Sequence, residues 1–295
     1  MRVTDNMRLG SALSSLSSLR SQHLRATREA STGLRVLAPS DDPAAAARLT
    51  RIQRMQSDGE AISRSLVMGR VDLELAEGTL ASSADLMKRA KELAMTAAND
   101  SLPADARASV ADEVASIREA LRGLANTKSS RGSIFAGSKT DGEAFDTSFT
   151  YQGDDYEHTI RSGGNSQVTI NASGARAFTA AGGRDIFTDL EALETALRDN
   201  DGASVRASLD VLERGHEQIT RERARTGVQL NRVAQGEEVL SELKLLYESQ
   251  KSEVAGVDPA ESYTKLITLE QAVQRSISVT ERLLSVSGLY LFSGQ

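Results

Sequence analysis

The feature that most constrains this chain is an apolar pattern that repeats every seven residues between residues 62 and 94. Large apolar side chains form one row of the repeat, and small residues form a second row offset by four. A period of seven places both rows on one side of an α-helix, and this side needs a partner helix to cover it. The large row, here named the central seam, contains Leu66, Leu73, Leu80 and Met87.

Helical spacing continues in the second half, where apolar residues from Leu209 to Tyr247 predict one helix of about fifty residues. A shorter pattern follows Pro103, and both ends of the chain carry apolar stripes as well. The terminal stripes, here named the assembly seam, cannot be buried by one helix alone and therefore predict assembly with neighbours. The assembly seam contains Leu9, Leu13, Leu16, Tyr263, Leu266, Val273, Ile277, Leu284 and Leu291.

Local signals mark where these helices begin. Asp42-Pro43 and Asp258-Pro259 each place an N-cap residue before a proline, which is favoured at the first helical position. Glu261 stands where a capping-box acid belongs, three residues after Asp258. Thr188 with Glu191 predicts a further capping box. These signals agree with the apolar patterns on where the helices start.

The middle of the chain differs from the rest. Glycines and most of the aromatic residues gather between residues 131 and 187, and short β-type runs alternate with glycine-rich turns. We expect a small β-rich insert that packs as a separate module and faces outward, with a hairpin turn at Gly153-Asp154-Asp155. The aromatic residues are Phe135, Phe145, Phe149, Tyr151, Tyr156, Phe178 and Phe187.

The predicted fold class is mainly α: a long antiparallel helical bundle or coiled coil, formed by the N- and C-terminal halves, with the small β-rich insert in the middle. We expect three parts. Residues 1–42 and 258–295 are terminal coiled-coil helices for assembly, residues 43–130 and 186–257 form a helical rod domain, and residues 131–185 form the outer insert.

Composition excludes several classes of protein. The chain has 295 residues and no cysteine, so disulfides and thiolate metal sites are ruled out. No apolar run reaches the roughly 18 residues of a membrane span, and the N-terminus lacks the apolar core of a signal peptide. Residues 1–35 carry six arginines and two acidic residues, a net charge of +4 within a chain of net charge −6. Without interleaved aromatic residues, this charge indicates a solvated helix face more than a nucleic-acid site.

Three motifs approach known catalytic or metal-binding patterns without completing them. Residues 132–140 nearly match a phosphate-binding P-loop, but Ser138 occupies the position of the required lysine. His216-Glu217 begins a zinc-protease motif that ends in Thr220, where a second histidine is needed. Residues 199–202 resemble part of a calcium loop but are better explained as a turn between helices. We therefore expect no enzyme activity, no metal and no cofactor.

Several stretches resemble a known family. Residues 30–36 and 39–44 are similar to the segment that joins the first two helices in flagellins and their hook-associated relatives. Residues 131–140, with Phe145 and residues 151–155, look like the hook–filament junction branch of that family. Residues 225–232 and 258–292 are similar to its returning and C-terminal helices. The polar ending at residues 293–295 departs from the family, which tends to finish with apolar residues.

The resemblance implies a structural subunit of the bacterial flagellum, located outside the cell and exported through the flagellar type III channel without a cleavable signal. It implies that terminal helices pair as an inner coiled coil and polymerise with further copies and with other flagellar subunits. It also implies an export chaperone on the C-terminal helix. From the composition and charge pattern we expect neither nucleic-acid binding nor membrane insertion. The alternatives are a flagellin of the filament, an unrelated coiled-coil adaptor, and an enzyme hidden in the β-rich insert.

Overall fold

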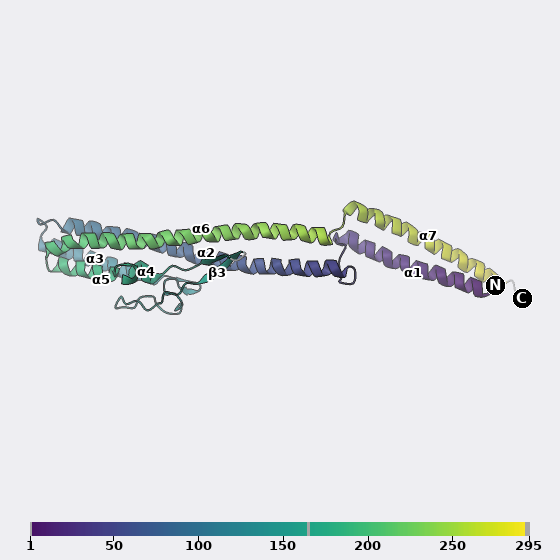
Figure 1. Ribbon diagram of the computed structural model, residues 1–295, viewed down its shortest axis with the longest axis horizontal. Helices are drawn as coiled ribbons and strands as arrows, with labels where there is room; N and C mark the ends of the chain where they lie inside the picture. The colour runs from purple at the N-terminus through teal and green to yellow at the C-terminus, as the bar shows by residue number, and fades with distance from the viewer. Residues whose placement is uncertain (1, 164–165, 293–295) are drawn as a thin grey trace. The chain divides into compact units, whose positions relative to one another are not determined.

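The computed structural model describes the backbone of residues 2–163 and 166–292, and the side chains of the same residues except 2–6, 9 and 284–292. Long helices dominate the chain, and short strands lie in its middle (Figure 1). The elements are α1 (Arg2–Thr32), α2 (Pro43–Ala97), α3 (Ala104–Ala125), β1 (Lys128–Ser129), β2 (Gly132–Ser133), β3 (Thr159–Gly163), β4 (Ser166–Thr169), α4 (Gly174–Phe178), η1 (Ala180–Gly182), α5 (Ile186–Arg198), α6 (Gly202–Ala255) and α7 (Pro259–Phe292).

These elements form two compact units. The central unit comprises Asp58–Leu243, and the terminal unit comprises the residues before Asp58 together with those after Leu243. The division crosses two continuous helices, α2 and α6. The predicted mainly helical fold with a small β-rich segment is confirmed, and α6 is the predicted long helix of the second half, with 54 residues.

In the central unit α2 and α6 run antiparallel. Ion pairs join them along their length, from Arg70–Glu237 (3.5 Å) through Glu77–Arg223 (2.6 Å) to Lys91–Glu213. Side chains between these two helices are fully buried. The four central-seam residues, Leu66, Leu73, Leu80 and Met87, each have an exposed fraction of 0%.

Two shorter helices complete this bundle. Helix α3 begins directly after Pro103 and packs against α5. The cap of α5 differs from the prediction: Asp185 is the N-cap, and its carboxylate accepts a hydrogen bond from the Thr188 amide at 3.1 Å. The helix therefore begins three residues earlier than predicted, and Thr188 lies inside its first turn, where its amide needs the acceptor that Asp185 provides. Residues 199–201 form the predicted turn before α6, with Asn200 in the left-handed region at φ 55°.

The two predicted Asp-Pro helix starts are confirmed. The Asp42 carboxylate accepts a hydrogen bond from the Ala45 amide at 2.9 Å at the beginning of α2. The Asp258 carboxylate accepts one from the Ala260 amide at 2.8 Å at the beginning of α7. Both carboxylates satisfy amide groups that have no partner within the helix.

The β-rich segment contains two small antiparallel sheets, β1–β2 and β3–β4, and its aromatic residues do not form a core of their own. Phe135, Phe145 and Phe178 are completely buried in the hydrophobic cluster that also contains side chains of α2, α3, α5 and α6. Phe145 lies 5.0 Å from Phe187, and Phe135 meets Phe178 edge to face at 5.6 Å, measured between ring centroids. The expectation of a separately packed module is therefore wrong, because these rings gain more apolar contact against the helices than a two-stranded sheet can offer.

The predicted turn at Gly153-Asp154-Asp155 is not a hairpin turn. The Asp154 carboxylate instead accepts hydrogen bonds from the amides of Ser138 (2.8 Å) and Tyr156 (3.1 Å). It thus ties this stretch to the loop after β2, whereas the antiparallel strand pairs of this region are β1–β2 and β3–β4.

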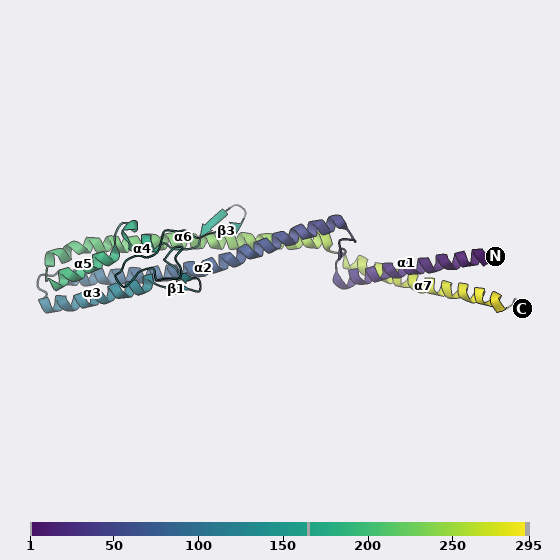
Figure 2. The same ribbon diagram turned by 90° about the horizontal axis from the view of Figure 1, so that it is seen from below.

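Two glycines in the long helices leave the space in which the β3–β4 hairpin packs against them. A Cβ atom at Gly69 of α2 would lie 2.6 Å from the Ile170 side chain, and one at Gly236 of α6 would lie 2.9 Å from Ser162. Figure 2 shows β3 beside α6. A helical glycine costs about 1 kcal/mol relative to alanine. Gly69 belongs to the row of small residues in the seven-residue repeat, which predicted a partner helix at this side of α2. The structure instead places Ile160 and Ile170 of the β3–β4 region against Gly69.

Candidate assembly interface

The terminal unit is built on an antiparallel pair, α1 and α7, in which the start of α1 and the end of α7 lie at the same end of the pair (Figures 1 and 2). The other end of the pair is closed by backbone hydrogen bonds. The Arg35 amide donates to the Ala255 carbonyl at 2.7 Å, and the Val257 amide donates to the Gly33 carbonyl at 3.1 Å. One turn into the pair, Lys265 donates to the buried Glu29 carboxylate at 2.8 Å.

The least exposed positions of the two helices alternate at spacings of four and three, as in a coiled coil. These inner rows bury little large apolar surface. Ala26, Ser262 and Thr280 are small or polar and fully buried, while the leucines of the rows are only half-buried. The inner rows are Ala12, Leu16, Leu19, His23, Ala26 and Ala30 on α1, and Ser262, Leu266, Leu269, Val273, Ser276 and Thr280 on α7.

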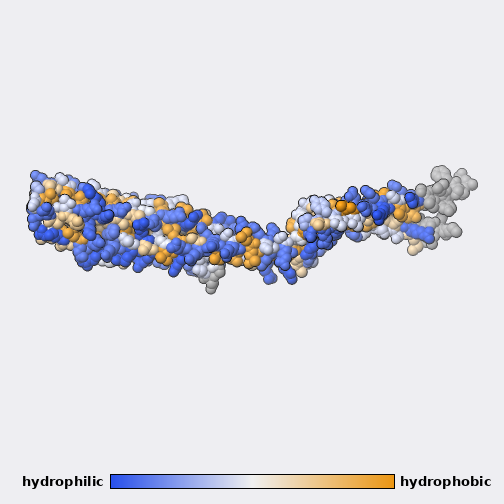
Figure 3. Space-filling model, turned by 90° about the horizontal axis from the view of Figure 1, so that it is seen from above, coloured by the Kyte–Doolittle hydropathy of each residue, from blue (hydrophilic) through white to orange (hydrophobic). Residues whose placement is uncertain are grey.

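Other large apolar side chains of the pair point to solvent. Leu13, Leu24, Tyr263 and Ile267 have exposed fractions of 49%, 57%, 57% and 54%. Figure 3 shows exposed apolar residues interspersed among polar ones. Fully burying one such side chain stabilises a protein by about 1.5–3 kcal/mol. The isolated pair therefore leaves much of this stabilisation unrealised.

The predicted assembly seam separates into two sets in the structure. Leu16, Leu266 and Val273 belong to the inner rows and lie between the two helices. Leu13 and Tyr263 are exposed, and Ile277 is half-buried beside the inner row. The side chains of Leu9, Leu284 and Leu291 lie outside the described residues.

Two aspartates hold the loop between α1 and α2. The Asp41 carboxylate accepts hydrogen bonds from the amides of Ala38 (3.0 Å) and Leu37 (3.2 Å), and these bonds hold its pKa below the ordinary value of 3.8, helped by the nearby Arg25. The pKa of Asp42 is lowered chiefly by its hydrogen bond from the Ala45 amide and then by Arg35. Both carboxylates are charged at neutral pH, so their hydrogen bonds to the backbone amides of the loop are present at that pH.

Sequence reasoning missed two buried polar residues of α6. Gln218, 2% exposed, donates to the carbonyls of Thr179 (3.0 Å) and Arg184 (3.0 Å) and accepts from the Arg184 amide at 2.8 Å. Glu222, also 2% exposed, accepts from the Ser173 amide and pairs with Arg176 at 3.3 Å. Both anchor residues 173–184 to α6. The one sequence signal near them was the incomplete zinc motif at 216–220. Gln218 is its middle residue, and Glu222 lies two residues beyond its end.

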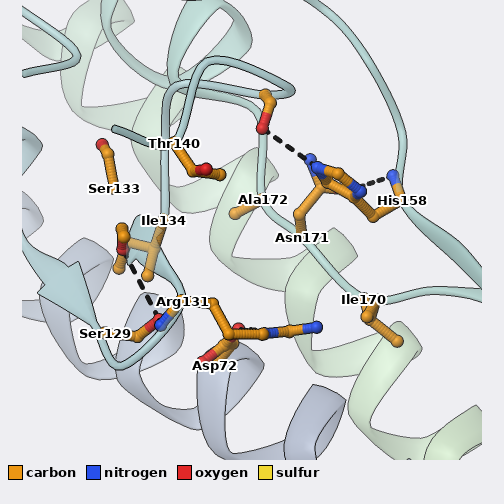
Figure 4. Close-up of a pocket in the computed structure, with 12 residues that line it drawn as sticks. Asp72, Ser129, Arg131, Ser133, Ile134, Thr140, His158, Ile170, Asn171 and Ala172 are labelled. Atoms are coloured by element: carbon orange, nitrogen blue, oxygen red, sulfur yellow. Dashed lines mark hydrogen bonds and ion pairs between the residues drawn. The ribbon is translucent and has the colours of Figure 1, made fainter. Parts of the chain in front are cut away.

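The β-rich segment also contains a cavity of about 230 Å³ (Figure 4). Its polar side chains already bind one another or the backbone: Arg131 donates to Asp72 at 2.7 Å, and His158 Nε2 lies 3.0 Å from the Gly137 carbonyl. Among the described residues there is no group of three or more histidine or acidic side chains able to hold a metal. Within the same residues, no helix has both the length and the apolar content to cross a bilayer.

Models of two helical regions match most of the chain: the bacterial flagellin N-terminal helical region at residues 3–140 and the bacterial flagellin C-terminal helical region at residues 209–291. The flagellar hook-associated protein 3 of Salmonella typhimurium is 26% identical over 302 residues, which cover 94% of this chain and 95% of that protein. The protein of the same name from Escherichia coli K12 is 26% identical over 316 residues, which cover 99% of each.

Solved structures show the same fold. A putative flagellar hook-associated protein from Vibrio parahaemolyticus aligns with a TM-score of 0.68 and 21% identity, over 73% of this chain and 100% of that one. The flagellar junction protein of Legionella pneumophila aligns with a TM-score of 0.55 and 15% identity, over 64% and 99%.

Proposed function

The chain belongs to the flagellin family and is a hook-associated structural protein of the bacterial flagellum, and we propose that it joins hook to filament by polymerising through its terminal helices. In this proposal residues 1–42 and 258–295 provide the contacts between subunits. Residues 43–130 and 186–257 support them, and residues 131–185 face outward.

One observation carries this proposal: the α1–α7 pair leaves large apolar side chains exposed in the single chain. Leu13, Leu24, Tyr263 and Ile267 would be covered when further subunits add their own terminal helices. Exposed apolar surface of this kind marks an interaction site. Association then gains the hydrophobic stabilisation that the isolated pair lacks.

The partners are further copies of the chain and other flagellar subunits on the hook and filament sides. Identical subunits that meet through two different surfaces continue into rings or helical arrays. We propose that the chain is exported without a cleavable signal. An export chaperone on the C-terminal helix would cover the same apolar side chains of α7 before assembly.

Deletion of the gene tests the proposal. We expect intact hooks without filaments and flagellin shed into the medium, both visible by electron microscopy and by analysis of the culture supernatant. The chain itself should be a trace component of purified flagella. Its presence as the bulk protein along the filament would identify a filament subunit, and normal filaments in the deletion strain would contradict the proposal.

A further inference from the structure

The two sides of the α1–α7 pair differ in chemistry. Successive residues of an α-helix are about 100° apart, so residues just before and just after an inner-row position lie on opposite sides of that helix. In an antiparallel pair, the residues that follow inner-row positions come out on the same side in both helices. The residues that precede them share the other side. The two are here named the following side and the preceding side.

The preceding side is largely polar, with one large exposed apolar side chain, Val279 of α7. Gln22 of α1 and Lys265 and Thr268 of α7 line one shallow groove, which confirms that preceding residues from both helices share a side. The ion pair between Glu29 and Lys265 lies here as well. These polar groups of the preceding side can therefore remain exposed to solvent.

The following side carries most of the large apolar side chains that the pair leaves exposed. It carries the exposed Leu13 and Leu24 of α1 and the exposed Tyr263 of α7, together with Ile267 and Ile277. It also carries single charges on each helix. Arg20 on α1, and Glu270 and Glu281 on α7, form no hydrogen bond or ion pair with any residue that the structure describes.

The charges of this side are opposite on the two helices and lie at similar levels. Glu29 is level with Lys265, so Arg20, nine residues earlier on α1, is level with Gln274, nine residues later on α7. Glu270 lies about one helical turn from that level. A second copy placed beside the first at the same level would therefore bring opposite charges together.

We propose that, in the assembled structure, this side packs against a second copy of the chain, with α1 of one copy beside α7 of the next and Arg20 paired with Glu270. Leu24 and Ile267 supply the apolar part of this contact. Each copy can place the α1 half of this side against the α7 half of one neighbour and its own α7 half against the α1 half of another, so the contact repeats from copy to copy and can close into a ring. The inference rests on the proposed function and specifies which side of the terminal pair forms the contact.

Charge exchange tests the pairing in the full-length chain, expressed in a strain that lacks it. Arg20→Glu and Glu270→Arg each place like charges together, and each should weaken association about two- to fivefold at every contact. We expect fewer filaments per cell with either variant and recovery when both are combined. Arg275→Glu, with the same change of charge on the polar side of α7, should leave filament number unchanged. Loss of filaments with Arg275→Glu alone, or no recovery in the double variant, would overturn the proposal.

Cross-linking tests the contact itself, because the chain has no cysteine of its own. Two differently tagged chains, one with Leu24→Cys and one with Ile267→Cys, are expressed together and treated with a short thiol cross-linker in isolated flagella; they should give a dimer that carries both tags on a denaturing gel. Separating the two cysteines between chains excludes a cross-link within one chain, where both positions lie on the same side of the α1–α7 pair. The matched chains with Gln22→Cys and Thr268→Cys, on the other side of the pair, should give monomers only. Monomers alone from the first two chains, or bands containing another protein, would contradict the contact. Absence of the chain from isolated flagella would instead contradict the proposed function.

Discussion

The central and terminal units carry the same kind of apolar repeat but bury it to very different extents. Leu66, Leu73 and Leu80 of α2 are completely buried against the rest of the central unit. In the terminal unit Leu13 and Tyr263 are about half exposed, and the buried positions between α1 and α7 hold alanine, serine and threonine. A heptad pattern therefore predicts that a helix needs a partner without telling whether that partner is the same chain.

The difference has a structural cause. In the central unit, α3, α5 and the aromatic residues of the β-rich segment add to the α2–α6 pair and close a common core. Among the described residues of the terminal unit, α1 and α7 pack together as a pair. Two helices cannot surround a large apolar side chain, whereas four helices and a loop cluster can.

The largest expected effect is on the central unit. Deleting residues 145–180 removes Phe145 and Phe178, each of which contributes about 3–5 kcal/mol by analogy with phenylalanine-to-alanine changes in protein cores. That loss is comparable to the total stability of a typical domain. We expect loss of the cooperative thermal transition, followed by circular dichroism.

A matched variant in the same segment is Tyr156→Ala, because Tyr156 is 58% exposed. It should change the free energy of unfolding by less than about 0.5 kcal/mol. An unchanged melting temperature in the deletion variant would show that the segment is a separate module after all.

Single leucines should show the same contrast between the units. Leu80→Ala should lower the free energy of unfolding by about 2–5 kcal/mol, because it leaves a cavity in a closed core. Leu13→Ala should cost less than about 1 kcal/mol, because that side chain is half exposed. Urea denaturation of the two variants measures both values. Equal losses would mean that α1 and α7 are as tightly packed as the central unit.

Ile277→Asp should affect assembly much more than stability. The side chain is half-buried in the single chain, so we expect unfolding within about 1 kcal/mol of the unchanged protein. In the assembled state the carboxylate would be buried without a partner, at a cost of several kcal/mol. Filament counts and melting curves separate the two effects. Arg275→Asp is the control on the polar side, and equal loss of filaments in both would argue against a contact at Ile277.

The smallest effect concerns pH. The pKa values of Asp41 and Asp42 are lowered in the folded chain, so their contribution to stability is present above the unfolded value of about 3.8 and is lost as pH falls through the folded values. We expect the amides of Leu37 and Ala38 to exchange hydrogen faster relative to their intrinsic rates below that pH. Asp41→Asn should abolish most of this change at those two amides. Protection that is independent of pH in the unchanged chain would contradict the assignment.

Particular residues show how far sequence reasoning reached. Asp42 and Asp258 were identified as caps because N-capping depends on a few neighbouring residues. Thr188 was misassigned because Asp185, just before it, offers an equally local alternative. The roles of Gln218 and Glu222 could not be predicted, since each bonds to groups more than thirty residues away in the chain.

The sequence by itself determined the helices, the seven-residue repeat of the central seam, the family resemblance and the absence of cysteine chemistry, because each depends on local spacing or composition. Only the tertiary structure decided that the aromatic residues of the β-rich segment belong to the central core. It also divided the single terminal stripe into residues between α1 and α7 and residues that point to solvent. The physical reason is that a repeat fixes which residues share one side of a helix, whereas the other elements of the fold fix what that side meets.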